Sequence, residues 1–255
     1  MYRSAAGFIG LSLLSYFAAG PVATAEPVST NEIACSKGGA EACFYAGADY
    51  ASGGNGLEMS KPKAAELFIK ACDLGVPDGC FYTAKWYRFG EEGISADPAR
   101  GIELYETACK MGHEEACQAL LSVLGRDEKG EKDIPRLVSA FEEGCANESI
   151  KACDWGGKFF YDGWRGENPD VVDGVRGAPL SYKTCKSTGS EFHCPVAENM
   201  YANPTSPIFD AERALELTTI NCEAGAKESC SNLGRIFAIV EDYEMAIGPY
   251  EKSCT

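Results

Sequence analysis

The sequence predicts an all-α solenoid, in which pairs of helices repeat along the chain and stack on one another. The first observation is the spacing of its 13 cysteines, 12 of which form pairs eight or nine positions apart. The first members of successive pairs are 36–40 residues apart, and a period of this length is typical of helical repeat arrays. The pairs are Cys35/Cys43, Cys72/Cys80, Cys109/Cys117, Cys145/Cys153, Cys185/Cys194 and Cys222/Cys230.

The second observation is that glycines lie between most of the paired cysteines. Two residues eight apart on one continuous helix are about 12 Å apart along its axis, whereas a disulfide requires Cα atoms about 4.4–6.8 Å apart. The chain therefore has to turn between the two cysteines, and glycine is the usual residue just after a helix. We expect each pair to bridge the end of one helix and the start of the next. The turn glycines are Gly38, Gly39, Gly75, Gly112 and Gly225.

The first helix of each unit is predicted to begin at the second cysteine of a pair. A small residue follows four positions later in four of the six units, and a large residue follows seven positions later in all of them. These offsets place the two residues on one face of a helix, where the small one permits close approach of a neighbour. The small residues are Gly47, Ala84, Gly157 and Gly234, and the large ones are Tyr50, Tyr87, Leu124, Phe160, Tyr201 and Phe237.

The second helix of each unit is predicted from its capping residue and its apolar spacing. A glycine-rich loop precedes it in the first two units, at 52–56 and 90–93. Ser and Asp side chains cap helix N-termini well, and Pro98 suits the first helical position. The capping residues are Ser60, Asp97, Asp133, Asp210 and Asp242, and the apolar periodicity is clearest in 64–72, 100–109, 213–222 and 245–254.

The pattern AC-x-x-G-x-x-x-[AG]C resembles the Sel1-like repeat family, which is related to the tetratricopeptide (TPR) repeats. The cysteine placement resembles its disulfide-bearing branch, the Helicobacter cysteine-rich proteins. The resemblance covers about residues 31–255, as six helix-pair units, and implies a right-handed superhelix with a concave surface. Two units depart from the pattern: one carries an insertion at 162–177, and the next has the nine-residue cysteine spacing with Pro195 beside Cys194.

Residues 1–25 are predicted to be a secretory signal peptide. Arg3 precedes an apolar run at 5–19, and Ala23-Thr24-Ala25 is a small-x-small cleavage site. A membrane-spanning helix is the alternative, but the run is short. Paired cysteines behind a signal peptide indicate an oxidising compartment, so we expect a secreted or periplasmic protein that has no membrane insertion after cleavage.

The composition excludes several classes of partner and cofactor. The formal net charge is −15, whereas nucleic acids and anionic lipids attract clustered Lys and Arg. The only two histidines, His113 and His193, are far apart in sequence, and no C-x-x-C motif occurs. We therefore predict no metal site, no thioredoxin-type redox motif and no cofactor. Both histidines are interpreted as structural, His113 in a turn and His193 without an Asp or Ser partner in register.

A catalytic hypothesis follows from the resemblance, because some cysteine-rich Sel1-like proteins have been described as penicillin-binding or as hydrolysing β-lactams. One S-x-x-K motif exists, formed by Ser60 and Lys63 at a predicted helix start. In serine β-lactamases this motif supplies the nucleophile and an activating lysine. Neither S-D-N nor K-T-G accompanies it here, so the competing interpretation, in which Ser60 is a helix cap, is favoured.

Three further features leave alternatives open. The recurrent aromatics Tyr45, Tyr82, Trp86, Trp155, Phe159 and Tyr182 either form the core between repeats or line the groove. Trp164 and Arg165 in the insertion have the composition of a binding hot spot, or pack back on the solenoid. Cys254 aligns with the first member of a further pair; it marks a truncated array, is a free thiol, or bridges to another molecule.

The leading functional hypothesis is a scaffold that binds a protein or peptide through its concave face, since such superhelices offer extended groove surfaces. The alternative is weak hydrolysis of β-lactams or of cell-wall peptides.

Overall fold

The computed structural model describes residues 28–125, 132–163 and 172–253. The predicted signal peptide, Trp164, Arg165 and Cys254 lie outside the described residues. Within those ranges the secondary structure is helical apart from one isolated β-bridge. The α-helices are α1 (Thr30–Ser36), α2 (Ala40–Ser52), α3 (Lys61–Asp73), α4 (Pro77–Phe89), α5 (Pro98–Lys110), α6 (Glu114–Leu124), α7 (Ile134–Ala146), α8 (Ile150–Asp162), α9 (Gly174–Thr188), α10 (His193–Tyr201), α11 (Ala211–Glu223), α12 (Lys227–Ile239) and α13 (Tyr243–Ser253), with a short 3₁₀ turn η1 (Gly54–Gly56).

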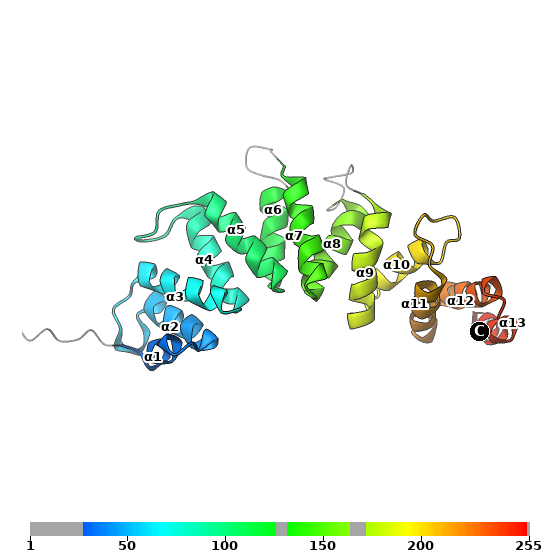
Figure 1. Ribbon diagram of the computed structural model, residues 1–255, viewed down its shortest axis with the longest axis horizontal. Coiled ribbons are helices and arrows are strands. Elements are labelled where there is room, and N and C mark those ends of the chain that lie inside the picture. Colours follow the sequence, from blue (N-terminus) through cyan, green and yellow to red (C-terminus); the bar gives the residue numbers. More distant parts are fainter. Residues whose placement is uncertain (1–27, 126–131, 164–171, 254–255) are drawn as a thin grey trace, which may run out of the picture.

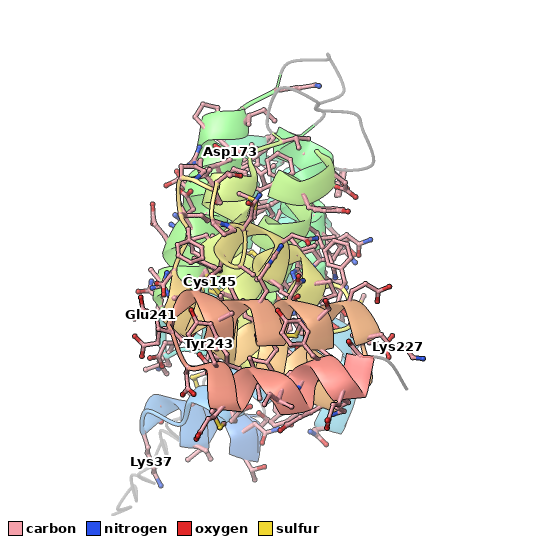
Figure 2. All side chains as sticks on the ribbon, turned by 90° about the vertical axis from the view of Figure 1, so that its right-hand side faces the viewer. Lys37, Cys145, Asp173, Lys227, Glu241 and Tyr243 are labelled. Carbon is pink, nitrogen blue, oxygen red and sulfur yellow. A yellow bond between two sulfur atoms is a disulfide. The ribbon has the colours of Figure 1, made fainter. Side chains whose placement is uncertain are left out.

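The helices form an α/α solenoid, an elongated arch that runs from α1 at one end to α13 at the other (Figure 1). Each helix packs on the next one in sequence, and further contacts join α6 to α8, α8 to α10 and α5 to α7. Viewed from the C-terminal end, α12 and α13 lie in front of the stacked pairs (Figure 2). The even-numbered helices therefore form one layer of the arch and the odd-numbered helices form the other.

Six disulfides join successive helices, one for each odd–even pair from α1–α2 to α11–α12. The bridged Cα atoms lie 4.5–4.8 Å apart. A bridge that closes so short a loop contributes about 2.5 kcal/mol in the chain-entropy model. The bridges have the pairing expected from the sequence: Cys35–Cys43, Cys72–Cys80, Cys109–Cys117, Cys145–Cys153, Cys185–Cys194 and Cys222–Cys230.

The chain turns between the bridged cysteines, as the sequence predicted. Gly38, Gly75, Gly112 and Gly225 have φ angles of 91–95°, which only glycine adopts readily. Each of these glycines donates its backbone N–H to the carbonyl of the first cysteine of its pair, at 2.9–3.0 Å. The turn therefore ends the odd-numbered helix directly after the cysteine that it carries.

The even-numbered helices begin earlier than the sequence pattern predicted, so the expectation that the second cysteine opens its helix was wrong. The second cysteine is the fourth residue of its helix in five units, and Cys194 is the second residue of α10. The turn needs few residues, and a cysteine inside the first helical turn directs its Cβ back towards the preceding helix. The five cysteines that lie inside the first turn are Cys43 of α2, Cys80 of α4, Cys117 of α6, Cys153 of α8 and Cys230 of α12.

The backbone hydrogen bonds show the same earlier start. In four of these units the N–H of the second cysteine donates to the carbonyl four residues before it, at 3.0–3.2 Å. That carbonyl belongs to the capping residue of the helix, so this bond is a regular helical bond of the first turn. The acceptors are Gly39 for Cys43, His113 for Cys117, Ser149 for Cys153 and Ala226 for Cys230.

The predicted small and large positions pack as expected. A Cβ atom on Gly47 would lie 2.6 Å from the ring of Phe68, and one on Gly234 would lie 2.9 Å from the ring of Tyr250. The large residues Phe160 and Tyr201 are each 1% exposed. Close approach at the small position and burial of the large one therefore hold neighbouring units together.

The predicted caps of the odd-numbered helices are also confirmed. Ser60, Asp97, Asp133 and Asp210 each accept a hydrogen bond from the backbone N–H three residues later, at 3.1–3.4 Å. Asp242 does the same at the start of α13, at 3.3 Å. Within the predicted insertion at 162–177, the structure starts α9 already at Gly174, after an Asp173 cap that the sequence pattern did not single out.

Candidate functional site

A cluster of aromatic side chains is exposed at the N-terminal end of the even-numbered layer. We call it the aromatic face and define it as Phe44 and Tyr45 on α2 with Tyr82, Trp86 and Phe89 on α4. Tyr45, Tyr82 and Phe89 are 55%, 41% and 67% exposed, respectively. Tyr82, Trp86 and Phe89 are spaced four and three residues apart and so share one side of α4. Some of the recurrent aromatics are therefore surface residues, whereas others, such as Phe159 at 1% exposure, pack inward.

The aromatic face is held together from below by Phe68 of α3, which is 3% exposed. Its ring centroid lies 5.2 Å from that of Phe44, 5.8 Å from that of Tyr82 and 5.4 Å from that of Trp86. Lys61 places its ammonium 5.2 Å from the centroid of Trp86. A buried ring thus fixes the positions of three rings of the aromatic face, which pre-organises this part of the surface.

The exposed surface of the same layer becomes polar towards the middle of the chain. The outward residues of α6 include Glu114, Glu115, Gln118 and Ser122, all polar and exposed. A second exposed aromatic contact occurs beyond them, where Tyr161 and Phe192 meet edge to face at 5.2 Å. Exposed aromatic side chains on this layer therefore gather near α2–α4, with a smaller contact near α8–α10.

The serine and the lysine of the S-x-x-K motif both make contacts that stabilise the fold. The hydroxyl oxygen of Ser60 caps α3 by accepting from the backbone N–H of Lys63 at 3.4 Å. The ammonium of Lys63 pairs with Glu32 at 3.0 Å and lies 5.4 Å from the centroid of the Tyr50 ring. The hydrogen bond from Lys63 to Glu32 raises the pKa of the lysine, which keeps it protonated. A protonated lysine cannot accept the proton of Ser60, so the geometry favours the capping role.

His113 lies in the predicted turn and caps the next helix. Its Nδ1 accepts from the backbone N–H of Ala116 at 3.3 Å, at the start of α6. The imidazole stacks on Phe81 with 4.3 Å between the centroids, and its Nε2 lies 3.6 Å from a carboxylate oxygen of Asp78. The side chain therefore acts as a packing and capping group between two units.

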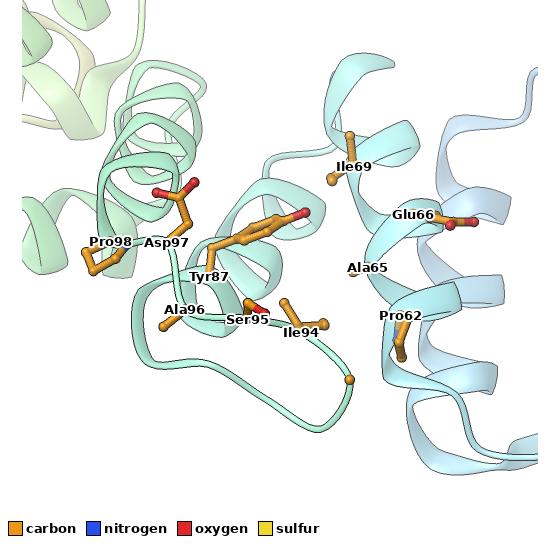
Figure 3. Close-up of a pocket in the computed structure, with 11 residues that line it drawn as sticks. Pro62, Ala65, Glu66, Ile69, Tyr87, Ile94, Ser95, Ala96, Asp97 and Pro98 are labelled. Carbon is orange, nitrogen blue, oxygen red and sulfur yellow. The ribbon is translucent and has the colours of Figure 1, made fainter.

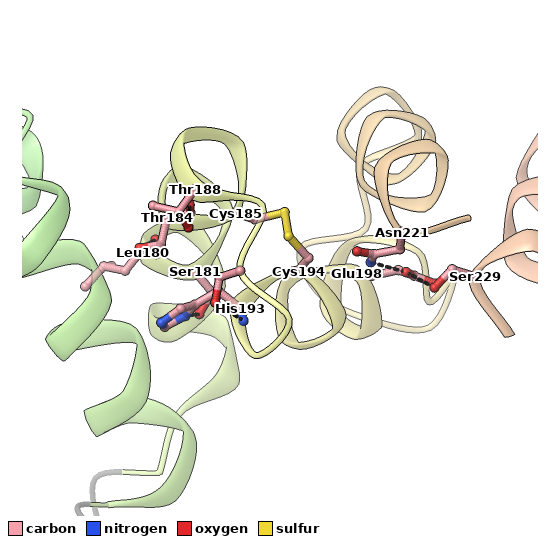
Figure 4. The surroundings of a disulfide bond; sticks show 11 residues. Leu180, Ser181, Thr184, Cys185, Thr188, His193, Cys194, Glu198, Asn221 and Ser229 are labelled. Carbon is pink, nitrogen blue, oxygen red and sulfur yellow. Dashed lines mark hydrogen bonds between the residues drawn. A yellow bond between two sulfur atoms is a disulfide. The ribbon is translucent and has the colours of Figure 1, made fainter. Parts of the chain in front are cut away.

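The sequence register offered His193 no Asp or Ser partner, whereas the structure supplies both from other helices. Its Nε2 lies 2.8 Å from Oδ1 of Asp154. Its Nδ1 lies 3.1 Å from Oγ of Ser181 (Figure 4). These partners are 39 and 12 positions away in sequence, so no local register could have placed them. In the neutral ring, Nε2–H donates to Asp154 and Nδ1 accepts from Ser181.

This Asp–His–Ser cluster resembles a hydrolytic triad in composition but not in access. The side chains of His193 and Ser181 are both 0% exposed, so an external substrate does not reach the hydroxyl. Burial of Asp154 opposes its ionisation, but hydrogen bonds from His193 and Lys158 outweigh this and lower its pKa. The cluster is therefore a buried polar junction between α8, α9 and α10.

A second buried polar junction surrounds Glu198 of α10, which is 3% exposed. Asn221 and Ser229 each donate to its Oε2 at 2.6 Å, and Asn232 donates to its Oε1 at 2.7 Å. These donors come from α11 and α12, so one carboxylate links three helices. Sequence reasoning missed Glu198, although it stands at the small position of its unit, four residues after Cys194.

A row of basic residues three positions after the helix caps was also missed, although the register of the caps could have revealed it. Three of these residues bind an acidic side chain on the preceding odd-numbered helix: Lys63 binds Glu32, Arg136 binds Glu106, and Arg176 binds Glu142. The hydrogen bond to Glu106 raises the pKa of Arg136. We call each such basic residue, with its acidic partner, a rung. The residues after the caps are Lys63, Arg100, Arg136, Arg176 and Arg213.

The described residues contain no group of three or more His, Cys, Asp or Glu side chains placed to hold a metal ion. Across the same residues, no helix combines the length and apolarity that a membrane span requires.

Comparison with known proteins identifies Sel1 repeats at residues 40–76 and 77–113. The first of these covers α2 and α3, and the second covers α4 and α5. A comparison with curated proteins finds no match.

Several solved structures are similar over most of this chain. One is c5321, a protective antigen of uropathogenic Escherichia coli strains with an SLR fold, at 19% identity and a TM-score of 0.47, over 88% of this chain and 48% of that one. This chain thus spans about half the length of that protein. A Sel1 repeat protein from Oxalobacter formigenes has 20% identity and a TM-score of 0.39, over 84% and 85% of the two chains. The immunity protein Pa5087 from Pseudomonas aeruginosa has 15% identity and a TM-score of 0.32, over 84% and 81%.

Proposed function

We propose that this Sel1-repeat solenoid is a scaffold of an oxidising compartment, secreted or periplasmic, that binds a protein or peptide through the aromatic face. We place the aromatic face on the concave side of the superhelix. The observation that carries the proposal is the cluster of exposed, pre-organised rings on α2 and α4. Large aromatic side chains with a basic neighbour are the residues that dominate the energetics of protein interfaces.

The position of the aromatic face supports a binding role over a packing role. Tyr45 and Tyr82 leave about half of their surfaces in solvent, at 55% and 41% exposure, although Phe68 beneath them is buried. Contiguous exposed apolar surface on a soluble protein usually marks an interaction site. The phenol groups also offer hydrogen bonds at the edge of the apolar surface, which suits a peptide backbone.

The disulfides support the proposed compartment. Six bridges in one chain are typical of proteins that fold in an oxidising environment, whereas structural disulfides are rare in the reducing cytosol. We further propose that the chain belongs to the disulfide-bearing branch of Sel1-like proteins, on the strength of the cysteine spacing.

The test is a selection of peptides from a random display library on the oxidised chain, followed by binding measurements with variants. We expect Tyr82→Ser with Phe89→Ser to weaken the selected peptides at least tenfold. Tyr243→Ser, which removes a comparably exposed ring on α13, is the matched control and should leave binding unchanged. Peptides that bind both variants equally would place the interaction elsewhere and refute the assignment of the aromatic face.

The hydrolytic alternative gains no support from the geometry of Ser60 or of Ser181. We expect a chromogenic cephalosporin to be hydrolysed only at the background rate, with no change in the Ser60→Ala variant. A rate well above background that this substitution abolishes would restore the alternative.

A further inference from the structure

A cleft of about 610 Å³ opens between α3 and the start of α5. One wall is formed by Pro62, Glu66 and Ile69 of α3, and the other by Tyr87, the loop that contains Ile94, and Asp97 (Figure 3). Tyr87 belongs to α4 but lies on a different side of that helix from Tyr82, Trp86 and Phe89. The cleft is therefore separate from the aromatic face.

The loop that borders the cleft is held against α3. A Cβ atom on Gly93, which has a φ angle of 75°, would lie 2.7 Å from Pro62. Glu91 and Ile94 exchange two backbone hydrogen bonds across the loop tip, at 3.1 and 2.8 Å. The cleft is thus bounded by a fixed turn on its open side.

The equivalent position in two later units contains an arginine of the protein itself. Arg176 lies 4.9 Å from the ring centroid of Phe160 and binds Glu142 at 2.6 Å. Arg213 lies 5.2 Å from the centroid of Tyr201 and 3.6 Å from the capping carboxylate of Asp210. In both units a guanidinium covers the large aromatic residue of the preceding even-numbered helix, beside a carboxylate.

The rung is missing at the cleft. Arg100 occupies the same register, three residues after Asp97, but it binds Glu103 of its own helix at 3.0 Å. The position that carries Glu32, Glu106 and Glu142 in the rungs is Ile69 in this unit. Among the described residues no cation lies over the ring of Tyr87, so this ring and the capping carboxylate face an open cleft.

We propose that the cleft binds a basic side chain, arginine or lysine, of a peptide or protein partner. Its cationic group completes the missing rung over the ring of Tyr87, beside the carboxylate of Asp97. Its aliphatic stem packs against Ile69 and Ile94. This site goes beyond the proposed function, because it lies on another side of α4 and selects a different chemistry.

The electrostatics favour a cation over a neutral or anionic group. The chain carries a formal net charge of −15, which draws basic segments to its surface. The basic residues that follow the caps of α3 and α5 are engaged elsewhere, since Lys63 binds Glu32 and Arg100 binds Glu103. The faces of aromatic rings attract cations, by about 0.5–2 kcal/mol.

The experiment is an NMR titration of the full, disulfide-intact chain with N-acetyl-arginine amide, using N-acetyl-citrulline amide as the neutral isostere. We expect the arginine derivative to shift amide signals of residues that line the cleft, and the citrulline derivative to bind at least fivefold more weakly. Replacing Tyr87 with leucine should weaken arginine binding by about 2- to 30-fold, the loss that a cation–π contact predicts.

A second variant keeps the test independent of any folding defect in Tyr87→Leu. Ile69→Glu restores the acidic position of a rung, so Arg100 should turn into the cleft and abolish binding without lowering the melting temperature. Phe89→Leu, on the aromatic face, is the control that should leave arginine binding unchanged. Because the cleft and the aromatic face are tested by different variants, a failure of arginine to bind the cleft would not affect the result of the peptide selection on the aromatic face.

Three outcomes would overturn the proposal. The first is equal binding of the arginine and citrulline derivatives. The second is unchanged binding in both Tyr87→Leu and Ile69→Glu. The third is binding that is absent from the wild-type chain and appears only in Arg100→Ala, which would mean that the protein's own arginine fills the cleft.

Discussion

The junctions between units differ between the two halves of the solenoid. The residue just before the second cysteine is small and apolar in the units of α4, α6 and α8, as Gly79, Ala116 and Ala152. In the units of α10 and α12 it is polar, as His193 and Ser229, and both side chains are buried. At this position the first half therefore stacks by apolar contact, whereas the second half stacks by hydrogen bonds around buried side chains.

The polar junctions explain how an irregular unit keeps its register in the stack. The polar junctions flank the bridge with nine-residue spacing, Cys185–Cys194, where the repeat departs from its period (Figure 4). Apolar contacts tolerate small shifts, whereas a buried carboxylate with three donors accepts only one arrangement. Glu198 and His193 thus fix the position of α10 against both of its neighbours.

The largest effect is expected when the Glu198 junction is removed. Glu198→Leu, which copies the residue at the same position of α6, would leave the buried donors of Asn221 and Ser229, and the half-buried donor of Asn232, without their acceptor. We expect a loss of about 3 kcal/mol in the free energy of unfolding, measured by urea denaturation of the oxidised chain. Glu228→Leu, at an exposed site of α12, is the control; an equal loss in both variants would contradict the role of the junction.

A smaller effect is expected from overpacking the histidine junction. In Gly157→Ala the new Cβ would lie 2.7 Å from Oγ of Ser181 and 3.0 Å from the ring of His193. We expect the melting temperature to fall, with a cost of about 1–3 kcal/mol. Gly248→Ala is the matched control, because its Cβ would meet no atom within 4 Å. A neutral result at Gly157 would show that the cluster can relax.

The pH dependence of the free energy of unfolding should reveal the lowered pKa of Asp154. Its pKa in the folded chain is below the ordinary value of 3.8, so ionisation of this group stabilises the fold above that pH. The contribution is lost as the pH falls through the folded pKa, where the carboxylate becomes protonated. Asp154→Asn should therefore lower stability at pH 6 and have little effect near pH 2. A difference that is constant across this range, in thermal melts, would exclude the linkage.

The smallest effect is expected at the surface of the first half. Lys151 and Glu114 form an exposed ion pair of 2.5 Å between α8 and α6. A double-mutant cycle with alanine should give a coupling of about 0.5 kcal/mol or less, and 1 M salt should reduce it further. A coupling as large as that between Glu198 and Asn232 would remove the contrast between exposed and buried junctions.

How much could be predicted from the sequence depended on the distance between partners along the chain. The cysteine pairs and the caps of the odd-numbered helices were predictable, since each involves residues at most nine positions apart. The starts of the even-numbered helices were placed up to one turn too late. The cysteine recurs in every unit and is easily recognised, whereas the first residue of the helix differs from unit to unit. The partners of His193 and Glu198 were not predictable, because they come from neighbouring units and depend on how helices stack.

The exposure of the aromatic side chains was the second property that the sequence could not predict. The periodicity put Tyr82 and Phe159 on helices alike, yet they are 41% and 1% exposed, respectively. A helical pattern shows which residues share a face, but the neighbours that cover that face come from other units. The aromatic face could therefore be separated from the core only in the folded chain.

The disulfides also determine how this protein would respond to a pulling force. Each bridge spans only eight or nine residues, so no bridge ties one end of the arch to the other. A solenoid held in this way can extend one unit at a time, while every bridge withholds roughly 20 Å of chain from the stretched length. Each extended unit keeps its turn formed, and the two helices that flank that turn remain positioned to fold back on one another when the force is released.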